Sequence, residues 1–363
     1  MEDIYAEESV AQEPVESETD IAKCPSCGAN MVFSPEKHAL ECPYCGTIKP
    51  LEISESEERA LENLINAERE WVAEAHVFRC ENCGAREVLR REDIAKKCSF
   101  CGTTNIVETD ELPGVKPNAV VPFKIEVDTA IEKFKAWVKK KFFAPSKFKK
   151  EVKAENISGV YNPAFTFDTN THSSYSGVLG KYYYKTVRVN GKTVRRRYTR
   201  YFNISGTFDM FFDDVLIQAS TVIEQKSLEK LQPFDTNQSR EYDKGFLSGY
   251  TATQYTKDGM ACWSEAKKKI DARLRSAILS QYTYDVVSSF NVSTMCSNVT
   301  YKYVLLPLYV GHSTWKEKNY NFFVNGVNGK VTGKTPVSAL KVGLVVLLGL
   351  LAVGGIVALA ILG

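Results

Sequence analysis

Two copies of a four-cysteine array, a β-rich middle region and an uncharged run at the C-terminus together predict a multidomain α+β protein. The expected parts are two small zinc ribbons joined by a helix, a mainly β domain with a few helices, and one C-terminal transmembrane helix. At 363 residues the chain exceeds the roughly 100–200 residues of a single domain. The expected boundaries are 1–22 for an acidic tail, 23–50 for the first ribbon, 51–76 for the linking helix, 77–112 for the second ribbon, 113–336 for the α+β domain and 339–362 for the transmembrane helix.

The formal net charge of +2 hides a strong separation of charge along the chain. Residues 1–75 carry 18 acidic and 5 basic side chains, whereas residues 113–200 carry 6 acidic and 19 basic ones. Residues 1–22 hold eight acidic side chains, no Lys or Arg and no apolar core, so they are neither a signal peptide nor a transit peptide. We expect a disordered acidic tail followed by a basic binding surface.

The cysteine arrays carry the most specific signal in the sequence. Both read C-x2-C-x14-C-x2-C, and every cysteine of the first array recurs 56 residues later in the second. A Gly follows each CxxC pair and allows the backbone to curl so that amides face the sulfurs. The expected metal ligands are Cys24, Cys27, Cys42 and Cys45 in the first array and Cys80, Cys83, Cys98 and Cys101 in the second.

Two zinc ions in structural sites are the predicted cofactors. Four thiolates complete a tetrahedral shell and leave no open position, so neither site is expected to be catalytic. Iron also accepts four thiolates and stays an alternative. Disulfides are a second alternative, disfavoured in a reducing compartment. The isolated Cys262 and Cys296 are interpreted as small, half-buried hydrophobic residues.

The segment from Ser54 to Ala75 predicts the linking helix, because Ser54 and Glu57 form a capping box and apolar residues recur at helical spacing. A second helix is expected to begin near Asp128 and to end before Pro145. A third is expected around Trp263 to Ser280.

Between these helices the pattern is that of β-strands. Residues 161–167 alternate, and 206–221, 299–310 and 320–332 indicate further strands. A hairpin is expected over 182–202 around Asn190-Gly191, which favours a type I′ turn. Residues 160–167 resemble 304–310, and a Val-Asn-Gly turn follows each, which suggests a duplication within the β domain.

This hairpin carries the candidate basic surface. Its residues 181–200 include eight basic side chains and no acidic one, with tyrosines interleaved. Such a surface suits single-stranded nucleic acid, anionic lipid headgroups or an acidic protein segment. The alternative is a hairpin that is merely solvated and binds no ligand. The basic residues are Lys181, Lys185, Arg188, Lys192, Arg195, Arg196, Arg197 and Arg200.

The C-terminal run from Val342 to Gly363 is 22 residues long and contains no charge. A helix of that length spans the ~30 Å hydrocarbon core of a bilayer, so the sequence predicts a single-pass tail anchor. Lys330, Lys334 and Lys341 precede the run. The positive-inside bias therefore predicts a cell-membrane location with the N-terminal domains in the cytoplasm.

No enzyme signature is present, and we expect neither catalytic nor cofactor-binding residues. Residues 328–335 would form a phosphate-binding loop only if Asn328 were Gly, and Pro336 follows directly, so we interpret them as a turn. Asp213-Asp214 is interpreted as the end of a strand, and the four histidines follow no metal or triad pattern.

The layout resembles bacterial proteins described as containing TFIIB-type zinc ribbons, which are often labelled as relatives of the primosomal replication-restart helicase. The resemblance rests on the CxxCG arrays, on residues 160–168, 231–235 and 246–250, and on residues 324–336 before the anchor. A Trp usual in the family is missing near Ala164 and Phe165, and no helicase motor motif is present. Some members are associated with membrane-stress systems of phage-shock and flotillin-like proteins, which implies a membrane recruiter.

Together these observations predict a membrane-anchored scaffold or adaptor that faces the cytoplasm and recruits protein partners through its zinc ribbons. The alternative is a membrane-tethered protein that binds nucleic acid through the 181–200 hairpin.

Overall fold

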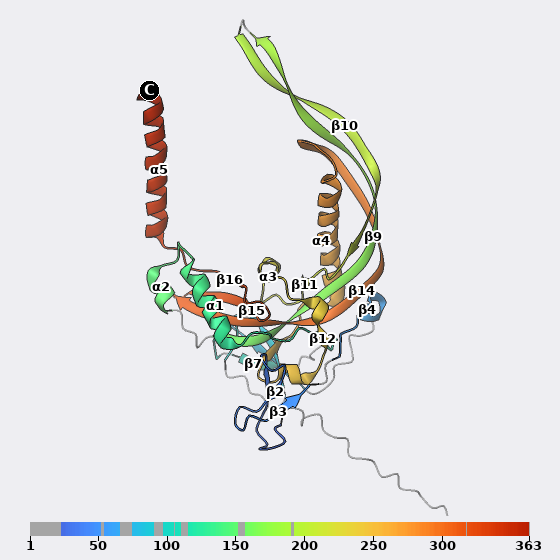
Figure 1. Cartoon of the computed structure of the whole chain (residues 1–363), viewed down its shortest axis with the longest axis vertical. Coiled ribbons are helices and arrows are strands. Elements are labelled where there is room, and N and C mark those ends of the chain that lie inside the picture. The colour runs from blue at the N-terminus through green and yellow to red at the C-terminus, as the bar shows by residue number, and fades with distance from the viewer. Residues whose placement is uncertain are drawn as a thin grey trace, which may run out of the picture.

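The structure is a computed structural model that describes residues 23–51, 54–65, 75–90, 97–104, 106–109, 115–151, 157–189, 192–316 and 318–362. Over these residues the protein is mostly β, with 16 strands and five α-helices (Figure 1). The strands form one three-stranded sheet and one mixed sheet of 13 strands. The predicted multidomain α+β arrangement is therefore wrong, because a single large sheet runs through most of the described chain. The predicted acidic tail, 1–22, lies outside the described residues.

The first ribbon forms the small sheet. Its strands β1 (Val32–Ser34), β2 (Ala39–Glu41) and β3 (Ile48–Pro50) pair antiparallel in chain order. The ribbon is fixed to the rest of the protein because the N–H of Phe33 donates to the carbonyl oxygen of Ser248 at 3.0 Å.

The second ribbon is built into the large sheet. Its strands β5 (Ala75–Cys80), β6 (Arg86–Arg90) and β7 (Ile106–Thr109) pair antiparallel, with β5 between the other two. β6 also pairs with β13 (Thr251–Thr253), where Ala252 lies opposite Val88. This ribbon therefore extends the large sheet instead of forming a separate module.

The predicted linking helix is wrong over its described part. Residues 59–60 form a short strand, β4 (Arg59–Ala60), and Leu61–Ile65 form a 3₁₀ helix. Residues 66–74 lie outside the described part, and Ala75 already begins β5. The backbone of β4 pairs with Thr300 and Tyr301, and this tertiary pairing overrides the helical periodicity of the sequence.

Two long antiparallel strands, β9 (Ile157–Val189) and β14 (Val286–Trp315), form the centre of the large sheet. The predicted hairpin is confirmed and is longer than expected: β10 (Lys192–Phe212) pairs with β9 along its whole length. Beyond the body of the protein, β10, β9 and the first half of β14 continue as a curved, three-stranded arm (Figure 1). The other side of β14 pairs with β15 (Lys318–Asn325), which in turn pairs with β16 (Val331–Gly333).

One arrangement of secondary-structure elements, strand–helix–strand, occurs twice in the chain. β8 (Ala119–Val120), helix α1 (Val127–Lys139) and β9 make the first copy, and β13, helix α4 (Gly259–Leu279) and β14 make the second. Each short strand runs parallel to the long strand of the other copy, β8 beside β14 and β13 beside β9.

The two similar segments that suggested a duplication lie at the centre of this repeat, where residues 160–164 pair antiparallel with 304–308. The carbonyl oxygens of Pro163 and Pro307 accept from the N–H groups of Ala219 and Gly326, at 3.2 and 2.9 Å. The carbonyl oxygens of Ala219 and Gly326 then each accept two N–H groups. The donors are Thr256 and Lys257 to Ala219, and Lys124 and Ile125 to Gly326.

Helices α1 and α4 occupy the regions predicted for them. α1 begins at Val127 with Glu126 as its N-cap, so Asp128 is not the cap, and it buries Ala130, Phe134 and Val138. α4 lies along the base of the arm (Figure 1) and buries Ile270, Leu274 and Ile278 among other residues. The remaining short elements are α2 (Ser146–Glu151), β11 (Ile217–Gln218), α3 (Gln225–Leu231), β12 (Arg240–Glu241) and 3₁₀ turns at Thr236–Gln238 and Lys244–Leu247.

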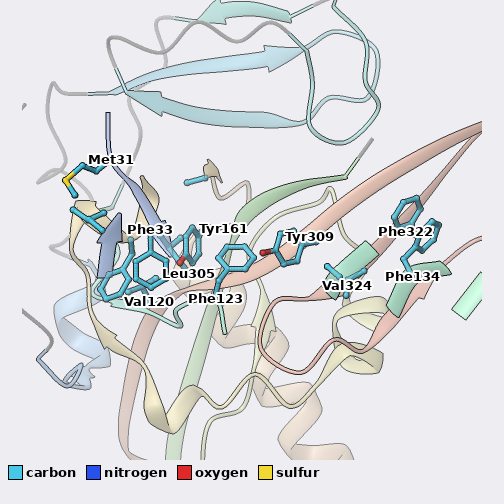
Figure 2. Close-up of a cluster of buried hydrophobic side chains, with 14 of the residues drawn as sticks. Met31, Phe33, Val120, Phe123, Phe134, Tyr161, Leu305, Tyr309, Phe322 and Val324 are labelled. Atoms are coloured by element: carbon cyan, nitrogen blue, oxygen red, sulfur yellow. The ribbon is translucent and has the colours of Figure 1, made fainter. Parts of the chain in front are cut away.

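One continuous core joins the first ribbon to the large sheet (Figure 2). Phe33 of β1 packs against Phe246, with ring centroids 5.2 Å apart. Phe123 stacks on Tyr250 at 4.2 Å and lies next to Tyr161. Burial of these aromatic side chains stabilises the docked ribbon by the hydrophobic effect.

The predicted membrane anchor is wrong. The C-terminal helix α5 (Ala339–Leu362) is present, and its start is held by Lys341, whose Nζ donates to the carbonyl oxygens of Phe142 and Ala144. Within the described part of the chain, no helix combines the length and apolar character needed to cross a membrane.

This finding also overturns what was inferred from the anchor. The single-pass membrane partner, the cell-membrane location and the placement of the N-terminal domains all depended on a span over 339–362. The argument that lipid headgroups are always within reach of the basic hairpin depended on it as well.

Candidate metal centres

All four CxxCG segments fold into the same tight turn. The N–H of each Gly donates to the carbonyl oxygen of the first cysteine of its pair, at 2.8 Å for Gly28 and Cys24. Each of these glycines has a φ between +70° and +73°, a conformation that residues with a Cβ rarely adopt. The other three turns are closed at 2.9 Å by Gly46 and Cys42, Gly84 and Cys80, and Gly102 and Cys98.

The turns bring the sulfurs together in two groups of four. The groups are Cys24, Cys27, Cys42 and Cys45, and Cys80, Cys83, Cys98 and Cys101, as predicted, with all four Sγ atoms within 4.8 Å of one another in each group. The Sγ atoms of Cys24 and Cys45 are 3.4 Å apart, and those of Cys80 and Cys101 are 3.6 Å apart. All eight are free cysteines. A tetrahedral ion with metal–sulfur bonds of about 2.3 Å fits inside such a group.

Without a cation, the four thiols of a group compete for protons. At Cys24, burial opposes ionisation, but the N–H groups of Ser26 and Cys27 outweigh it and lower the pKa to about 6. At Cys27, the N–H of Ala29 favours the thiolate, but sharing a proton with Cys42 and Cys45 raises the pKa to about 12. Four adjacent thiolates need a positive charge between them, which a bound metal ion supplies.

The second centre is braced by its neighbours in the large sheet. The buried carboxylate of Glu87 accepts the N–H of Ser99, between Cys98 and Cys101, at 2.9 Å. Burial raises the pKa of Glu87. Gly102 lies against the ring of His312, so that a Cβ there would come within 2.2 Å of Nε2.

The two ribbons differ at one equivalent position. Tyr44 occupies the third position of Cys42-Pro-Tyr-Cys45, and its side chain is 83% exposed. Phe100 occupies the same position of Cys98-Ser-Phe-Cys101 and is fully buried. Close to Tyr44 in the sequence, Ile48 of β3 is 50% exposed. The first ribbon therefore presents apolar side chains to solvent at the place where the second ribbon buries one.

The predicted basic residues do lie on one hairpin. Antiparallel register places alternate residues on its two faces, with Tyr184 opposite Arg197 and Tyr183 opposite Tyr198. The face with Tyr184 carries Arg188, Arg195 and Arg197, and the face with Tyr183 carries Lys181, Lys185, Lys192, Arg196 and Arg200.

Sequence reasoning missed a buried cluster of charges next to β4. The side chain of Lys302 is 9% exposed, and its Nζ lies 3.2 Å from Oδ1 of Asp214 and 3.4 Å from Oε1 of Glu58. Asp168 accepts the N–H of Asp214 at 2.8 Å. Asp214 does follow the end of β10, as predicted. No local pattern marks the cluster, because its members come from four separate segments.

Most of the remaining sites that the sequence analysis considered behave as interpreted. Cys262 is buried, and burial raises its pKa to about 12, so its thiol stays neutral. Burial also raises the pKa of Cys296. Residues 328–335 are only partly the turn that was expected, because Val331–Gly333 within them form strand β16.

Fold and site together define a mainly β protein with two tetracysteine groups that could bind two metal ions, one of them within the large sheet. No family model matches the sequence. The chain is 29% identical over 330 residues to a Bacillus subtilis (strain 168) protein described as uncharacterized protein YdjG, covering 88% of this chain and 91% of that one. No solved structure matches.

Proposed function

We propose that this protein is a zinc-dependent scaffold that recruits a protein partner through its first ribbon. The observation that carries the proposal is the exposure of Tyr44 on a metal-binding turn, while the equivalent Phe100 is buried. A tyrosine held on a rigid loop binds a partner at low cost in conformational entropy, and tyrosines are enriched among the residues that dominate protein interfaces.

Zinc is the ion we propose for both centres. Four cysteine thiolates in a closed shell match structural zinc, and such a shell leaves no position for a substrate or an activated water. Iron is the alternative that the ligands also accept. The role of the ions is then to fold and hold the two ribbons, and no catalytic step is assigned to the protein.

The two ribbons have different roles in this proposal. The second ribbon is part of the large sheet through β6 and β13 and buries its own Phe100. The first ribbon is docked through Phe33 and Phe246 but leaves Tyr44 and Ile48 in solvent. We assign partner binding to the first ribbon and stability of the sheet to the second.

Site-specific photocrosslinking in cells tests this assignment. A photoreactive phenylalanine analogue placed at Tyr44 should form a covalent adduct with a partner protein, and the adduct should disappear when Ile48 is also replaced by Ser. The control places the same analogue at Tyr201, which is 58% exposed on the arm. The proposal fails if Tyr44 gives no adduct, or if both positions give the same set of adducts.

A further inference from the structure

The arm carries a positively charged surface, which the proposed function does not use. Between residues 181 and 200 the hairpin is rich in Lys and Arg and contains no acidic residue. In the described part of the chain, Arg195, Arg196 and Arg197 form no ion pair. The carboxylate of Asp285, at the base of the hairpin, accepts the backbone N–H of Tyr182 at 2.7 Å. A surface with this excess of positive charge needs a negatively charged ligand.

Four of the tyrosine rings on this surface contact a neighbouring side chain. The guanidinium groups of Arg195 and Arg197 lie over the rings of Tyr184 and Tyr182, each 4.4 Å from the ring centroid. On the other face, Tyr183 stacks against Tyr198 with centroids 5.7 Å apart. Bases of a single-stranded nucleic acid bind by stacking on free aromatic faces, and each of these four rings already has a side-chain partner on one face, which leaves fewer faces for stacking.

The same arrangement favours carboxylates. A guanidinium group held over a tyrosine ring is restrained by that contact, and the ring accepts no hydrogen bond in the plane of the guanidinium, so its N–H groups stay available to other acceptors. Carboxylates accept such N–H groups in pairs, and the ordered side chains lose little conformational entropy on binding. Among the described strands, β10, which carries the arginines, pairs only with β9, so its other edge offers backbone groups to an extended peptide.

The chain contains an acidic segment of suitable length outside the described residues. Residues 1–22 carry eight acidic side chains, no Lys or Arg and a single Pro, and the hairpin carries eight basic side chains. An extended strand of this length covers about 70 Å, enough to follow the hairpin over all of its basic positions. The two segments are therefore complementary in charge, and the acidic one is long enough to span the basic one.

The positions of the two segments favour binding between two molecules. The first ribbon, which begins directly after residue 22, and the tip of the hairpin lie at opposite ends of the long axis of the molecule (Figure 1). To reach the hairpin of its own chain, the acidic segment would have to pass the body of the molecule. The hairpin of a second molecule placed head to tail can be reached without passing the body.

We propose that the basic hairpin of one molecule binds the acidic segment 1–22 of a second copy of this chain. The contact is heterologous, since two different surfaces meet, so it links molecules in series or closes into a ring. It is independent of the proposed docking at Tyr44.

Sedimentation velocity of three proteins tests the proposal: the full chain, a chain without residues 1–22, and a chain with Arg195→Gln, Arg196→Gln and Arg197→Gln. The full chain should self-associate at low salt, and raising the salt to about 0.5 M should weaken the association about tenfold or more. Each variant alone should be monomeric. An equimolar mixture of the two variants should form a one-to-one complex, because each supplies the part that the other lacks.

A control variant carries Lys147→Gln, Lys149→Gln and Lys150→Gln in α2, which removes the same amount of charge away from the hairpin. It should associate like the full chain. The proposal is overturned if the full chain is monomeric at low salt, or if removal of residues 1–22 leaves the association unchanged. It is also overturned if an oligonucleotide of about 20 nucleotides binds the full chain and the truncated chain equally well, because the hairpin would then be free of the acidic segment.

Discussion

Asp168 is a carboxyl group outside the metal centres whose pKa the structure raises strongly. Burial, together with the carboxyl groups of Glu58 and Asp214, raises its pKa to about 7. Burial also opposes ionisation of Glu58, but the hydrogen bond from Thr300 outweighs it and lowers the pKa of Glu58. Three carboxyl groups share one ammonium group, that of Lys302, so the cluster retains a proton near neutral pH, and Asp168 is where we place it.

This proton makes the stability of the protein depend on pH. In the unfolded chain Asp168 has an ordinary pKa near 4, so between about pH 4 and 7 the folded state holds a proton that the unfolded state has lost. The contribution of this group to the free energy of unfolding is therefore largest at low pH and decreases as pH rises through that window. Asp168→Asn imitates the protonated form and should flatten the decrease.

Urea unfolding at several pH values between about 5 and 8 measures this difference. The wild-type midpoint should fall relative to that of Asp168→Asn as pH rises. Asp271→Asn, at an exposed position of α4, removes the same charge and should leave the wild-type slope unchanged. Parallel curves for wild type and Asp168→Asn would show that Asp168 does not carry the proton.

Among the elements, the two ribbons should differ in what they contribute to stability. Cys27 and Cys83 hold equivalent positions in the two arrays, and both are exposed. Cys83→Ser removes a ligand from the ribbon that continues the large sheet through β6 and β13, so its effect should spread into the sheet. Cys27→Ser should loosen the first ribbon and leave the large sheet folded.

Thermal unfolding and hydrogen exchange distinguish the two outcomes. Cys83→Ser should lower the free energy of unfolding by about 3 kcal/mol or more and increase exchange in β13. Cys27→Ser should increase exchange in β1 to β3 only. Equal effects on β13 from both variants would contradict the distinct roles that we assign to the ribbons.

Local patterns predicted those elements that are fixed by local chemistry. The CxxCG turns follow from the glycines, the β9–β10 hairpin follows from Asn190-Gly191 and its flanking strands, and α1 and α4 follow from helical periodicity. The length of β9 was not predictable, because residues 169–177 are mostly polar and lack hydrophobic alternation, and only their pairing with β10 and β14 fixes them as a strand.

The errors came from contacts between distant segments. The capping box at Ser54 and Glu57 predicted a helix, but pairing of Arg59 and Ala60 with β14 gives a strand instead. The spacing of the cysteines predicted both metal groups but not that one ribbon joins the large sheet. Within the candidate site the ligands were therefore predictable, whereas the contrast between Tyr44 and Phe100 depends on tertiary packing.

At the scale of the whole molecule, the chain contains two kinds of repeat. The tetracysteine array occurs twice, and the strand–helix–strand unit of the sheet occurs twice, as β8–α1–β9 and β13–α4–β14. One ribbon packs beside β8 through the core that contains Phe33 and Val120, and the other pairs with β13. Each half of the sheet is thus associated with one tetracysteine group, and a metal ion bound by that group would brace its half of the sheet.

Native mass spectrometry of the full chain, purified without chelator, tests this central claim most directly. The folded protein should carry two zinc ions per chain. When a strong chelator is added to the partly denatured protein, both ions should be lost and the remaining fold should be lost with them. Cys27→Ser and Cys83→Ser should each retain one ion. A folded full chain that carries fewer than two metal ions would contradict the account.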